Sequence, residues 1–153
     1  MRAAFFMAGI GLALGLYLFA TPPQSPAESG LRLTLGSATI RADLATTSAA
    51  RSQGLSGRAG LAEDEGLLFV FVRDGQYSFW MKDMRFPIDI IWIAADKRIV
   101  EVASEVAPET YPHSFTSREL ARFVLEVPAG FAAAHGITVG SYARGIPSGL
   151  AAE

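Results

Sequence analysis

Two carboxylic acids lie in segments of the sequence that are otherwise apolar. Asp89 is in the run PIDIIW (87–92), and Glu126 is in the run FVLEV (123–127). Because an unpaired buried carboxylate costs several kcal/mol, each acid must be paired, lie in a solvated cleft or be protonated. Two such groups could act as acid and base on a glycoside, although the sequence gives no distance between them.

Basic and aromatic residues occur where they could meet these acids. Lys82 ends a short apolar run that contains Trp80, and Arg51 and Arg58 flank a glycine-containing loop. We expect one of these cations to neutralise one of the two acids near one rim of a sheet. The predicted polar cluster consists of Arg58, Trp80, Lys82, Asp89 and Glu126.

The predicted cluster has two interpretations. As a structural ion pair, it would anchor the loop over residues 54–64 on the sheet. As a functional site, it would be a pocket beside Trp80 that binds a small polar ligand or assists chemistry, since perturbed charges gather at such sites. Trp80 and Trp92 could be stacking platforms for a sugar or peptide, or they could be parts of the core.

Other kinds of site find little support in the residues. The chain has no cysteine, which excludes disulfides, thiolate catalysis and cysteine-bound metal. His113 and His135 lie in different segments, so they form no i, i+4 metal pair. No nucleophile elbow, Walker motif or dinucleotide glycine pattern is present. We therefore expect no cofactor and no metal.

The composition favours one compact domain with a real core. Of the 153 residues, 50% are hydrophobic and 18% are charged, which is too apolar a balance for a disordered chain. The net charge is −2 and no basic run occurs, so nucleic acid is not an expected partner.

The first 27 residues differ from the rest of the chain. A positive start, an uncharged stretch over 3–20 and small residues at Ser25 and Ala27 are typical of a cleaved secretory signal. The alternative is an uncleaved membrane anchor, because the stretch approaches the roughly 20 residues that span a bilayer. We expect a signal or anchor with a Pro-rich linker at 1–27 and one exported domain at 28–153, periplasmic or anchored to the outer face of the inner membrane.

Short alternating or apolar runs, bounded by Gly and Pro, predict a sheet. The expected strands are 31–35 and 38–45 as a hairpin, then 67–72, 77–81, 88–94, 98–106 near a sheet edge, 122–127 and, as a last candidate, 142–145. Short helices are expected at 49–53 and 129–135, with loops at 54–64 and 108–117. Since full crossover helices are missing, we predict a mainly β fold rather than a parallel sheet. It would be a β-sandwich or jelly-roll-like barrel with one or two short helices.

Several short motifs follow one another in a specific order. They are RxxGLxxR (51–58), EGLLFxF (65–71), FWMKDM (79–84), PIDII (87–91), VLEVxxG (124–130) and GIxxG (136–140). This order resembles the DUF192 family over about residues 38–144. The resemblance implies a compact, mainly β domain, often behind a signal peptide or anchor, with no agreed activity. The residues that the family pattern contains map here onto Arg58, Trp80, Met81, Lys82, Asp89 and Glu126. This sequence departs from the pattern at Asp83, where Asn is common, and at Leu67, where Met is common.

These observations support three functional hypotheses. The first is an exported binding or accessory module for a small polar ligand or cell-envelope component, which would be bound by the predicted cluster. The second is a hydrolase that acts on an envelope glycan or peptide through Asp89 and Glu126. The third is a purely structural envelope protein. Contact with a membrane is expected only through residues 1–27, if that segment stays uncleaved.

Overall fold

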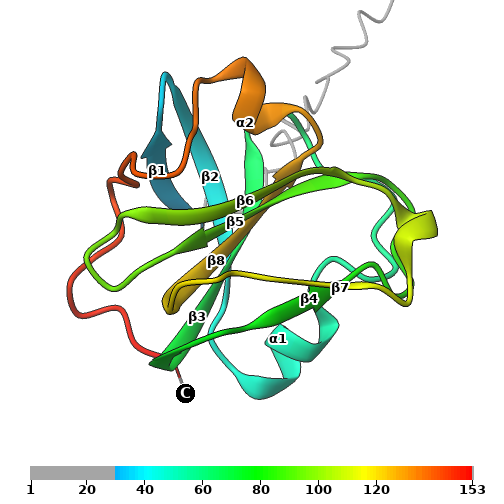
Figure 1. Ribbon diagram of the computed structural model, residues 1–153, viewed down its shortest axis with the longest axis horizontal. Helices are drawn as coiled ribbons and strands as arrows, with labels where there is room; N and C mark the ends of the chain where they lie inside the picture. The colour runs from blue at the N-terminus through cyan, green and yellow to red at the C-terminus, as the bar shows by residue number, and fades with distance from the viewer. Residues whose placement is uncertain (1–29, 153) are drawn as a thin grey trace, which may run out of the picture.

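The computed structural model describes residues 30–152, so the predicted leader at 1–27 lies outside the described residues. Short strands dominate this part of the chain, with two short α-helices and one 3-10 turn (Figure 1). The elements are β1 (Leu31–Leu35), β2 (Ala38–Ala45), α1 (Ser48–Gln53), β3 (Glu65–Gly75), β4 (Ser78–Trp80), β5 (Ile88–Ile93), β6 (Ile99–Val106), η1 (Pro108–Thr110), β7 (Ser114–Thr116), β8 (Ala121–Pro128) and α2 (Phe131–Ala134).

Six of the strands form one open, mixed sheet in the order β1-β2-β3-β8-β5-β6, and β4 pairs with β7 in a second, smaller sheet. The predicted mainly β fold with two short helices is confirmed, and the large sheet does not close into a barrel. The predicted first hairpin is also confirmed, because β1 and β2 pair antiparallel from Leu31 opposite Ala42 to Leu35 opposite Ala38. β6 lies at the edge of the large sheet, as expected.

One pair of neighbouring strands is parallel, which the sequence analysis did not anticipate. β2 and β3 run in the same direction, from Arg41 opposite Glu65 to Ala45 opposite Phe69. A parallel pair needs a crossover connection of about a dozen residues or more, and here α1 with its following loop supplies it. We excluded a parallel arrangement because α1, with six residues, is too short to stand out as a crossover helix.

The crossover helix α1 begins and ends where its capping residues predict. The Thr47 hydroxyl accepts a hydrogen bond from the Ala50 amide at 3.1 Å, which satisfies one of the free N–H groups of the first turn. Gly54 ends the helix with φ 52° and ψ −137°, a conformation that residues with a side chain rarely adopt. The chain can therefore turn sharply at Gly54 and return toward β3.

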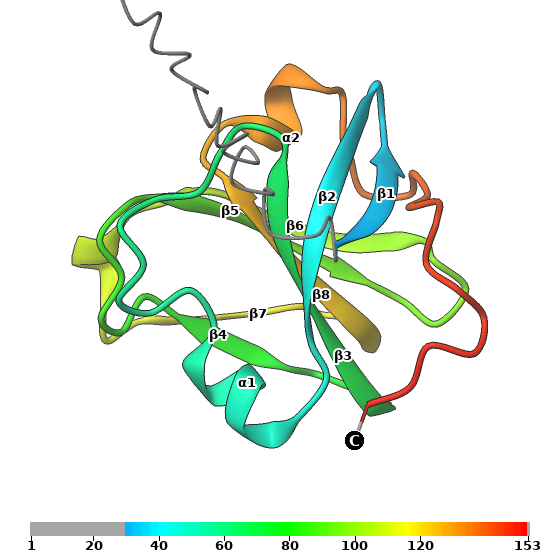
Figure 2. The ribbon, with the colours of Figure 1, turned by 180° about the vertical axis from the view of Figure 1, so that it is seen from behind.

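The large sheet is buried on both faces, and each face has its own core. On one face, α2 and the C-terminal segment cover side chains such as Leu33, Val70 and Ile91. On the other face, the smaller sheet and the loop after α1 cover side chains such as Phe69 and Trp92. Figures 1 and 2 show α2 at one end of the molecule and α1 with β4 and β7 at the other.

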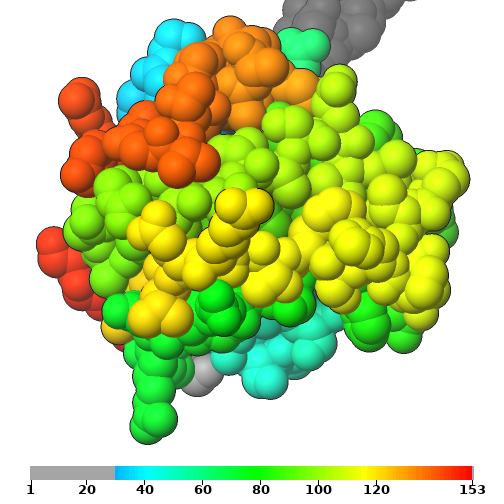
Figure 3. Space-filling model, viewed as in Figure 1, coloured from blue at the N-terminus to red at the C-terminus, as the bar shows by residue number. Residues whose placement is uncertain are grey.

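Two short segments differ from the prediction. The expected loop at 108–117 contains η1 and β7, and β7 pairs with β4 through Phe79 opposite Phe115. A strand of three residues is too short to show periodicity, so only the pairing reveals it. Figure 3 shows this segment (yellow) crossing the viewer's side of the molecule, beside β4 (green). The candidate strand at 142–145 is wrong, since this stretch makes only isolated bridges through Tyr142 and Arg144.

Candidate functional site

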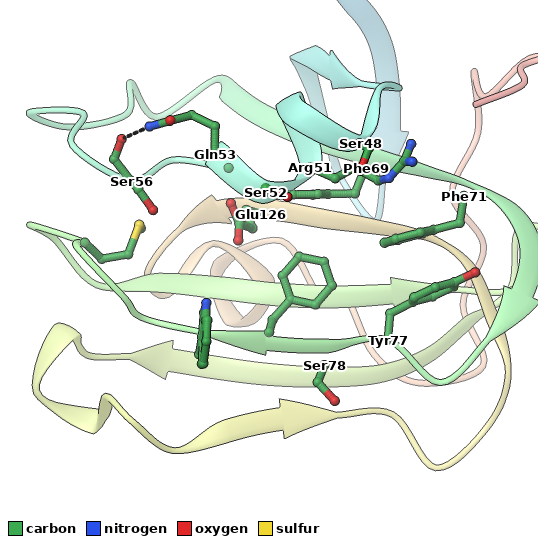
Figure 4. Close-up of a pocket in the computed structure, with 14 residues that line it drawn as sticks. Ser48, Arg51, Ser52, Gln53, Ser56, Phe69, Phe71, Tyr77, Ser78 and Glu126 are labelled. Carbon is green, nitrogen blue, oxygen red and sulfur yellow. Dashed lines mark hydrogen bonds between the residues drawn. The ribbon is translucent and has the colours of Figure 1, made fainter. Parts of the chain in front are cut away.

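A cleft of about 360 Å³ separates α1 from β4 (Figure 4). Strands β3 and β8 form its floor. One wall consists of α1 and the residues that follow it, and the other wall consists of β4 and the residues beside it. The volume lies within the range of about 300–1,000 Å³ that is usual for small-molecule sites. The lining residues are Ser48, Arg51, Ser52, Gln53, Gly54, Ser56, Phe69, Phe71, Tyr77, Ser78, Phe79, Trp80, Met84 and Glu126.

Most of the apolar side chains that line the cleft are aromatic. Phe71 and Tyr77 stack at one end, with ring centroids 3.5 Å apart and planes 9° apart (Figure 4). Phe69 meets Phe79 edge-to-face, with centroids 4.8 Å apart. Trp80 remains 54% exposed, so its indole is available to a molecule that enters the cleft. These rings offer flat apolar surfaces at little conformational cost.

Glu126 is the one acid that lines the cleft. It lies on β8 opposite Leu67 of β3 and Ile90 of β5, and is only 6% exposed. Within residues 30–152, its Oε2 is the one buried side-chain polar atom without a hydrogen-bond partner. Burial raises the pKa of Glu126 to about 8, and the charge of Arg58 opposes this only in part. At neutral pH the Glu126 carboxyl is therefore protonated, uncharged and able to donate a hydrogen bond.

Gly54 leaves room beside this carboxyl. A Cβ atom at this position would lie 3.3 Å from Cζ of Phe69 and 3.9 Å from Oε2 of Glu126. Since the positive φ of Gly54 also disfavours any side chain, glycine both ends α1 and lets the backbone approach the floor of the cleft.

Arg51 supplies the one formal charge that lines the cleft at neutral pH. Its Nη1 donates hydrogen bonds to the backbone carbonyls of Thr46 and Val70, the latter at 3.0 Å. Its guanidinium lies 5.6 Å from the centre of the Phe71 ring, within the range of a cation–π contact. These contacts attach α1 to β3 and hold the guanidinium at the aromatic end of the cleft (Figure 4).

The loop that follows α1 is tied to the turn that follows β4. The Gln53 side chain donates to the Ser56 carbonyl at 2.8 Å, and the Ser56 hydroxyl donates to the Lys82 carbonyl at 2.9 Å. The Gly57 amide donates to the Asp83 carbonyl at 3.0 Å. Because the bonds to Lys82 and Asp83 join the two walls of the cleft, its shape is largely set before any ligand arrives.

The structure distributes the predicted cluster over several places. Trp80 and Glu126 line the cleft together. Lys82 lines an adjoining groove that also contacts Trp80. Arg58 lines a separate groove on the β2 side of α1, where it pairs with Asp43 at 3.1 Å. The predicted ion pair between these cations and Glu126 is not formed.

Asp89 occupies a different part of the molecule. It is fully buried, and backbone amides hold both of its oxygens: Oδ1 accepts from Glu105 at 2.7 Å and Gly130 at 3.0 Å, and Oδ2 accepts from Ala132 at 2.8 Å. We expected Arg51, Arg58 or Lys82 to neutralise Asp89 or Glu126, and at Asp89 no such pair forms because three backbone N–H donors hold the carboxylate instead. Asp89 does not line the cleft.

Several cleft residues were missed from the sequence. Arg51 was considered only as a partner for the acids, and the polar side chains of α1 and the two stacked rings were not singled out. The capping signal at Thr47 and the following Gly54 predicts the helix itself, but it does not report that α1 lies beside the apolar strand over residues 67–72. No pattern in the sequence reports that β4 faces α1 across a gap. Besides Arg51, the lining residues that were not predicted as site residues are Ser48, Ser52, Gln53, Gly54, Ser56, Phe69, Phe71, Tyr77, Ser78, Phe79 and Met84.

Fold and cleft together define a small, mainly β domain of uncharacterised activity. The chain belongs to the DUF192 family, described as "Uncharacterized ACR", whose model matches residues 31–144. Within the part of the chain that the structure describes, no group of three or more His, Asp or Glu residues could hold a metal ion, and no helix is long and apolar enough to cross a membrane.

Two solved structures are similar to this chain. One is a protein of unknown function from Novosphingobium aromaticivorans, with 29% identity and a TM-score of 0.70 over 82% of this chain and 94% of that one. The other, from Sinorhizobium meliloti, is called a "putative transcription regulator"; it has 30% identity and a TM-score of 0.69 over 75% of this chain and 91% of that one. No curated protein matches the chain.

Proposed function

We propose that this protein is an exported binding or accessory module that holds a small polar ligand in the cleft above Glu126. The observation that carries the proposal is Glu126, which lines the cleft and whose buried Oε2 has no hydrogen-bond partner within residues 30–152. A buried polar group without a hydrogen bond costs about 1–3 kcal/mol. A ligand that accepts the carboxyl proton would remove this penalty.

The walls of the cleft indicate the remaining chemistry of the ligand. The rings of Phe71, Tyr77 and Trp80 favour a molecule with an apolar or flat face. Ser52 and Gln53 add groups that can bind polar substituents. Because the two walls are tied to each other by hydrogen bonds, little ordering is needed on binding. Export is proposed from the pattern of residues 1–27 alone.

The hydrolase hypothesis is less well supported by this geometry. A pair of catalytic carboxyls must flank the same bond of the substrate. Glu126 lines the cleft, whereas Asp89 is fully buried with both oxygens bonded to backbone amides. The Sinorhizobium protein is named as a transcription regulator, but direct binding of nucleic acid has no support in a chain with net charge −2 and no basic run.

A thermal-shift screen with a variant that blocks the cleft tests the proposal. Ser52 is exposed on α1 and lines the cleft, so Ser52→Trp should fill the entrance without disturbing the core. Ser104→Trp, at an exposed position of β6 outside the cleft, is the matched control. Sugars, short peptides and small organic acids would be screened, because a ligand of the folded state must raise its unfolding temperature.

We expect at least one compound to raise the unfolding temperature of the wild type and of Ser104→Trp but not of Ser52→Trp. A compound that stabilises all three proteins equally, or a screen with no stabilising compound, would contradict a binding function for this cleft.

A further inference from the structure

The cleft continues past Trp80 into the adjoining groove. Four residues line both the cleft and the groove: Ser52, Gln53, Ser56 and Trp80. The groove also contains Gly57, Lys82 and Asp83. Its volume is about 510 Å³, compared with about 360 Å³ for the cleft. Because the side chains between the two spaces belong to both, one elongated molecule can lie across them.

Trp80 is exposed at this junction and is held in place by a second ring. It is 54% exposed, and its ring meets that of Tyr111, with centroids 5.8 Å apart and planes 67° apart. Tyr111 is itself 46% exposed and follows η1, where its amide donates to the Pro108 carbonyl at 3.2 Å. Single exposed apolar side chains are common on protein surfaces, whereas contiguous ones mark sites of interaction. The two rings in contact therefore indicate a binding surface beside the cleft.

The polar side chains that share the junction with Trp80 are all neutral. Serine hydroxyls and the glutamine amide both donate and accept hydrogen bonds. Gln53 donates to the Ser56 carbonyl (Figure 4), and the Ser56 hydroxyl donates to the Lys82 carbonyl. Within residues 30–152, the amide oxygen of Gln53 and the lone pairs of the Ser56 hydroxyl make no further bond. They can therefore accept from the hydroxyl groups of a ligand, which also donate and accept.

The formal charges around the junction do not favour a charged ligand. Lys82 and Asp83 are both exposed in the groove and have opposite charges. Figure 4 shows Arg51 beside Phe71 at one end of the cleft and Ser56 at the other. The Arg51 guanidinium is already bonded to the Val70 carbonyl at 3.0 Å. A polar but uncharged ligand fits these surroundings best.

We propose that the ligand is an uncharged oligosaccharide of two or more sugar units that lies across the cleft and the groove, with one sugar ring stacked on Trp80. This inference rests on the proposed function and specifies the ligand class. A sugar ring presents an apolar C–H face to an indole and a rim of hydroxyl groups to the neutral side chains around it. A peptide would need strand-edge hydrogen bonds or pockets for its side chains, whereas the residues that surround Trp80 are short and polar.

Isothermal titration calorimetry on the full chain tests the inference with three series of neutral sugars. The probes are β-1,4-linked glucose, α-1,4-linked glucose and β-1,4-linked N-acetylglucosamine, each as the monosaccharide and the trisaccharide, with tetraalanine as the peptide probe. The proteins are the wild type, Trp80→Ala, and Trp80→Phe, which keeps a ring. Tyr142→Ala is the matched control, because Tyr142 is 55% exposed and lines neither the cleft nor the groove.

Tryptophan fluorescence adds a readout that is specific for the junction. The chain has two tryptophans, and Trp92 is fully buried whereas Trp80 is exposed. Quenching by acrylamide therefore reports mainly on Trp80. A sugar stacked on the indole should protect it from the quencher and shift its emission to shorter wavelength. In Trp80→Phe the same sugar should leave the emission of Trp92 unchanged.

We expect at least one trisaccharide to bind the wild type and Tyr142→Ala at least about tenfold more tightly than its monosaccharide, since only the longer sugar reaches both the cleft and the groove. Trp80→Ala should lose at least about tenfold in affinity for it, and Trp80→Phe should retain most of the affinity.

Four results would overturn the inference: equal affinity for mono- and trisaccharide, equal affinity of wild type and Trp80→Ala, binding of tetraalanine in place of the sugars, or no binding of any sugar. In each case the proposed function would stand if a compound from the thermal-shift screen still stabilised the wild type and not Ser52→Trp. It would fail as well if no compound bound in a way that Ser52→Trp blocks.

Discussion

The two buried acids of this protein, Asp89 and Glu126, lie on adjacent strands and have opposite surroundings. Asp89 accepts three backbone hydrogen bonds and joins β5 to β6 and to the start of α2. Glu126 has an oxygen with no partner within residues 30–152 and lies at the floor of a cleft. An acid inside an apolar strand can thus be a structural anchor or a functional group, and its hydrogen-bond partners distinguish the two.

The pairing of β5 with β8 explains why the two acids are separated. Asp89 lies opposite Val127, and Ile90 lies opposite Glu126. Residues directly opposite share a face of the sheet and successive residues alternate, so Asp89 and Glu126 point to opposite faces. Asp89 therefore points toward the core beneath α2, and Glu126 points toward the core beneath the smaller sheet.

The largest effect on stability should come from the anchored acid. Asp89→Ala removes the acceptor for three backbone amides and the fully buried carboxylate that they hold, so we expect the free energy of unfolding to fall by roughly 3–5 kcal/mol. Urea unfolding at pH 7 measures this change. A loss below about 1 kcal/mol would mean that Asp89 does not anchor α2 and β6.

Replacing Glu126, the acid in the cleft, should change the free energy of unfolding in a way that depends on pH. Burial raises the pKa of Glu126 from 4.5 to about 8, so between these values the folded state binds more protons than the unfolded state. Wild-type stability should therefore fall as pH rises through this window, by up to about 1.4 kcal/mol per pH unit. Glu126→Gln lacks this proton, and its stability relative to the wild type should increase by about 2 kcal/mol from pH 6 to pH 8.

Urea unfolding at pH 6, 7 and 8, with Glu119→Gln as the control, measures this difference. A constant difference between Glu126→Gln and the wild type across the three pH values would show that Glu126 is ionised throughout and that the cleft does not hold a neutral acid.

A glycine beside each acid sharpens the comparison. Gly54→Ala places a methyl group 3.3 Å from Phe69 in a backbone conformation that disfavours side chains, and should cost roughly 2 kcal/mol. Gly130 has φ 80°, but a Cβ there meets only Oε1 of Glu105 at 4.0 Å, so Gly130→Ala should cost about 1 kcal/mol. Thermal unfolding of the two variants gives the order, and the reverse order would show that the floor of the cleft is not closely packed against Gly54.

The smallest effect should come from Arg58, which we first considered as a partner of the buried acids. It pairs instead with Asp43, and both side chains are well exposed, at 41% and 54%. Arg58→Ala should therefore change the free energy of unfolding by less than about 1 kcal/mol. A loss of several kcal/mol in urea unfolding would restore the interpretation that Arg58 stabilises a buried carboxylate.

Much of the fold could be predicted because strand alternation and capping are local signals. The hairpin of β1 and β2, the N-cap at Thr47 and the edge position of β6 follow from short runs of sequence. Alternation also predicted that Asp89 shares a strand face with Ile91 and that Glu126 shares one with Val124. The parallel pair and β7 were missed, because both depend on which distant segments come together.

The candidate site was predicted less well, for the same physical reason. Trp80 and Glu126 do line one cleft, but Asp89 was placed with them because the register between β5 and β8 cannot be deduced from either strand alone. Likewise, a need for charge compensation at Asp89 was correctly inferred from its apolar neighbours. The sequence does not reveal that backbone amides, rather than an arginine or a lysine, meet that need.

The protonation state of Glu126 is the property on which the proposed ligand chemistry depends most directly. It can be measured by following the side-chain carboxyl carbon by ¹³C NMR as the pH is changed, with Glu126→Gln used to assign the signal. We expect the Glu126 signal to titrate near pH 8 in the empty protein. Titration near the ordinary glutamate value of 4.5 would contradict a neutral acid at the floor of the cleft.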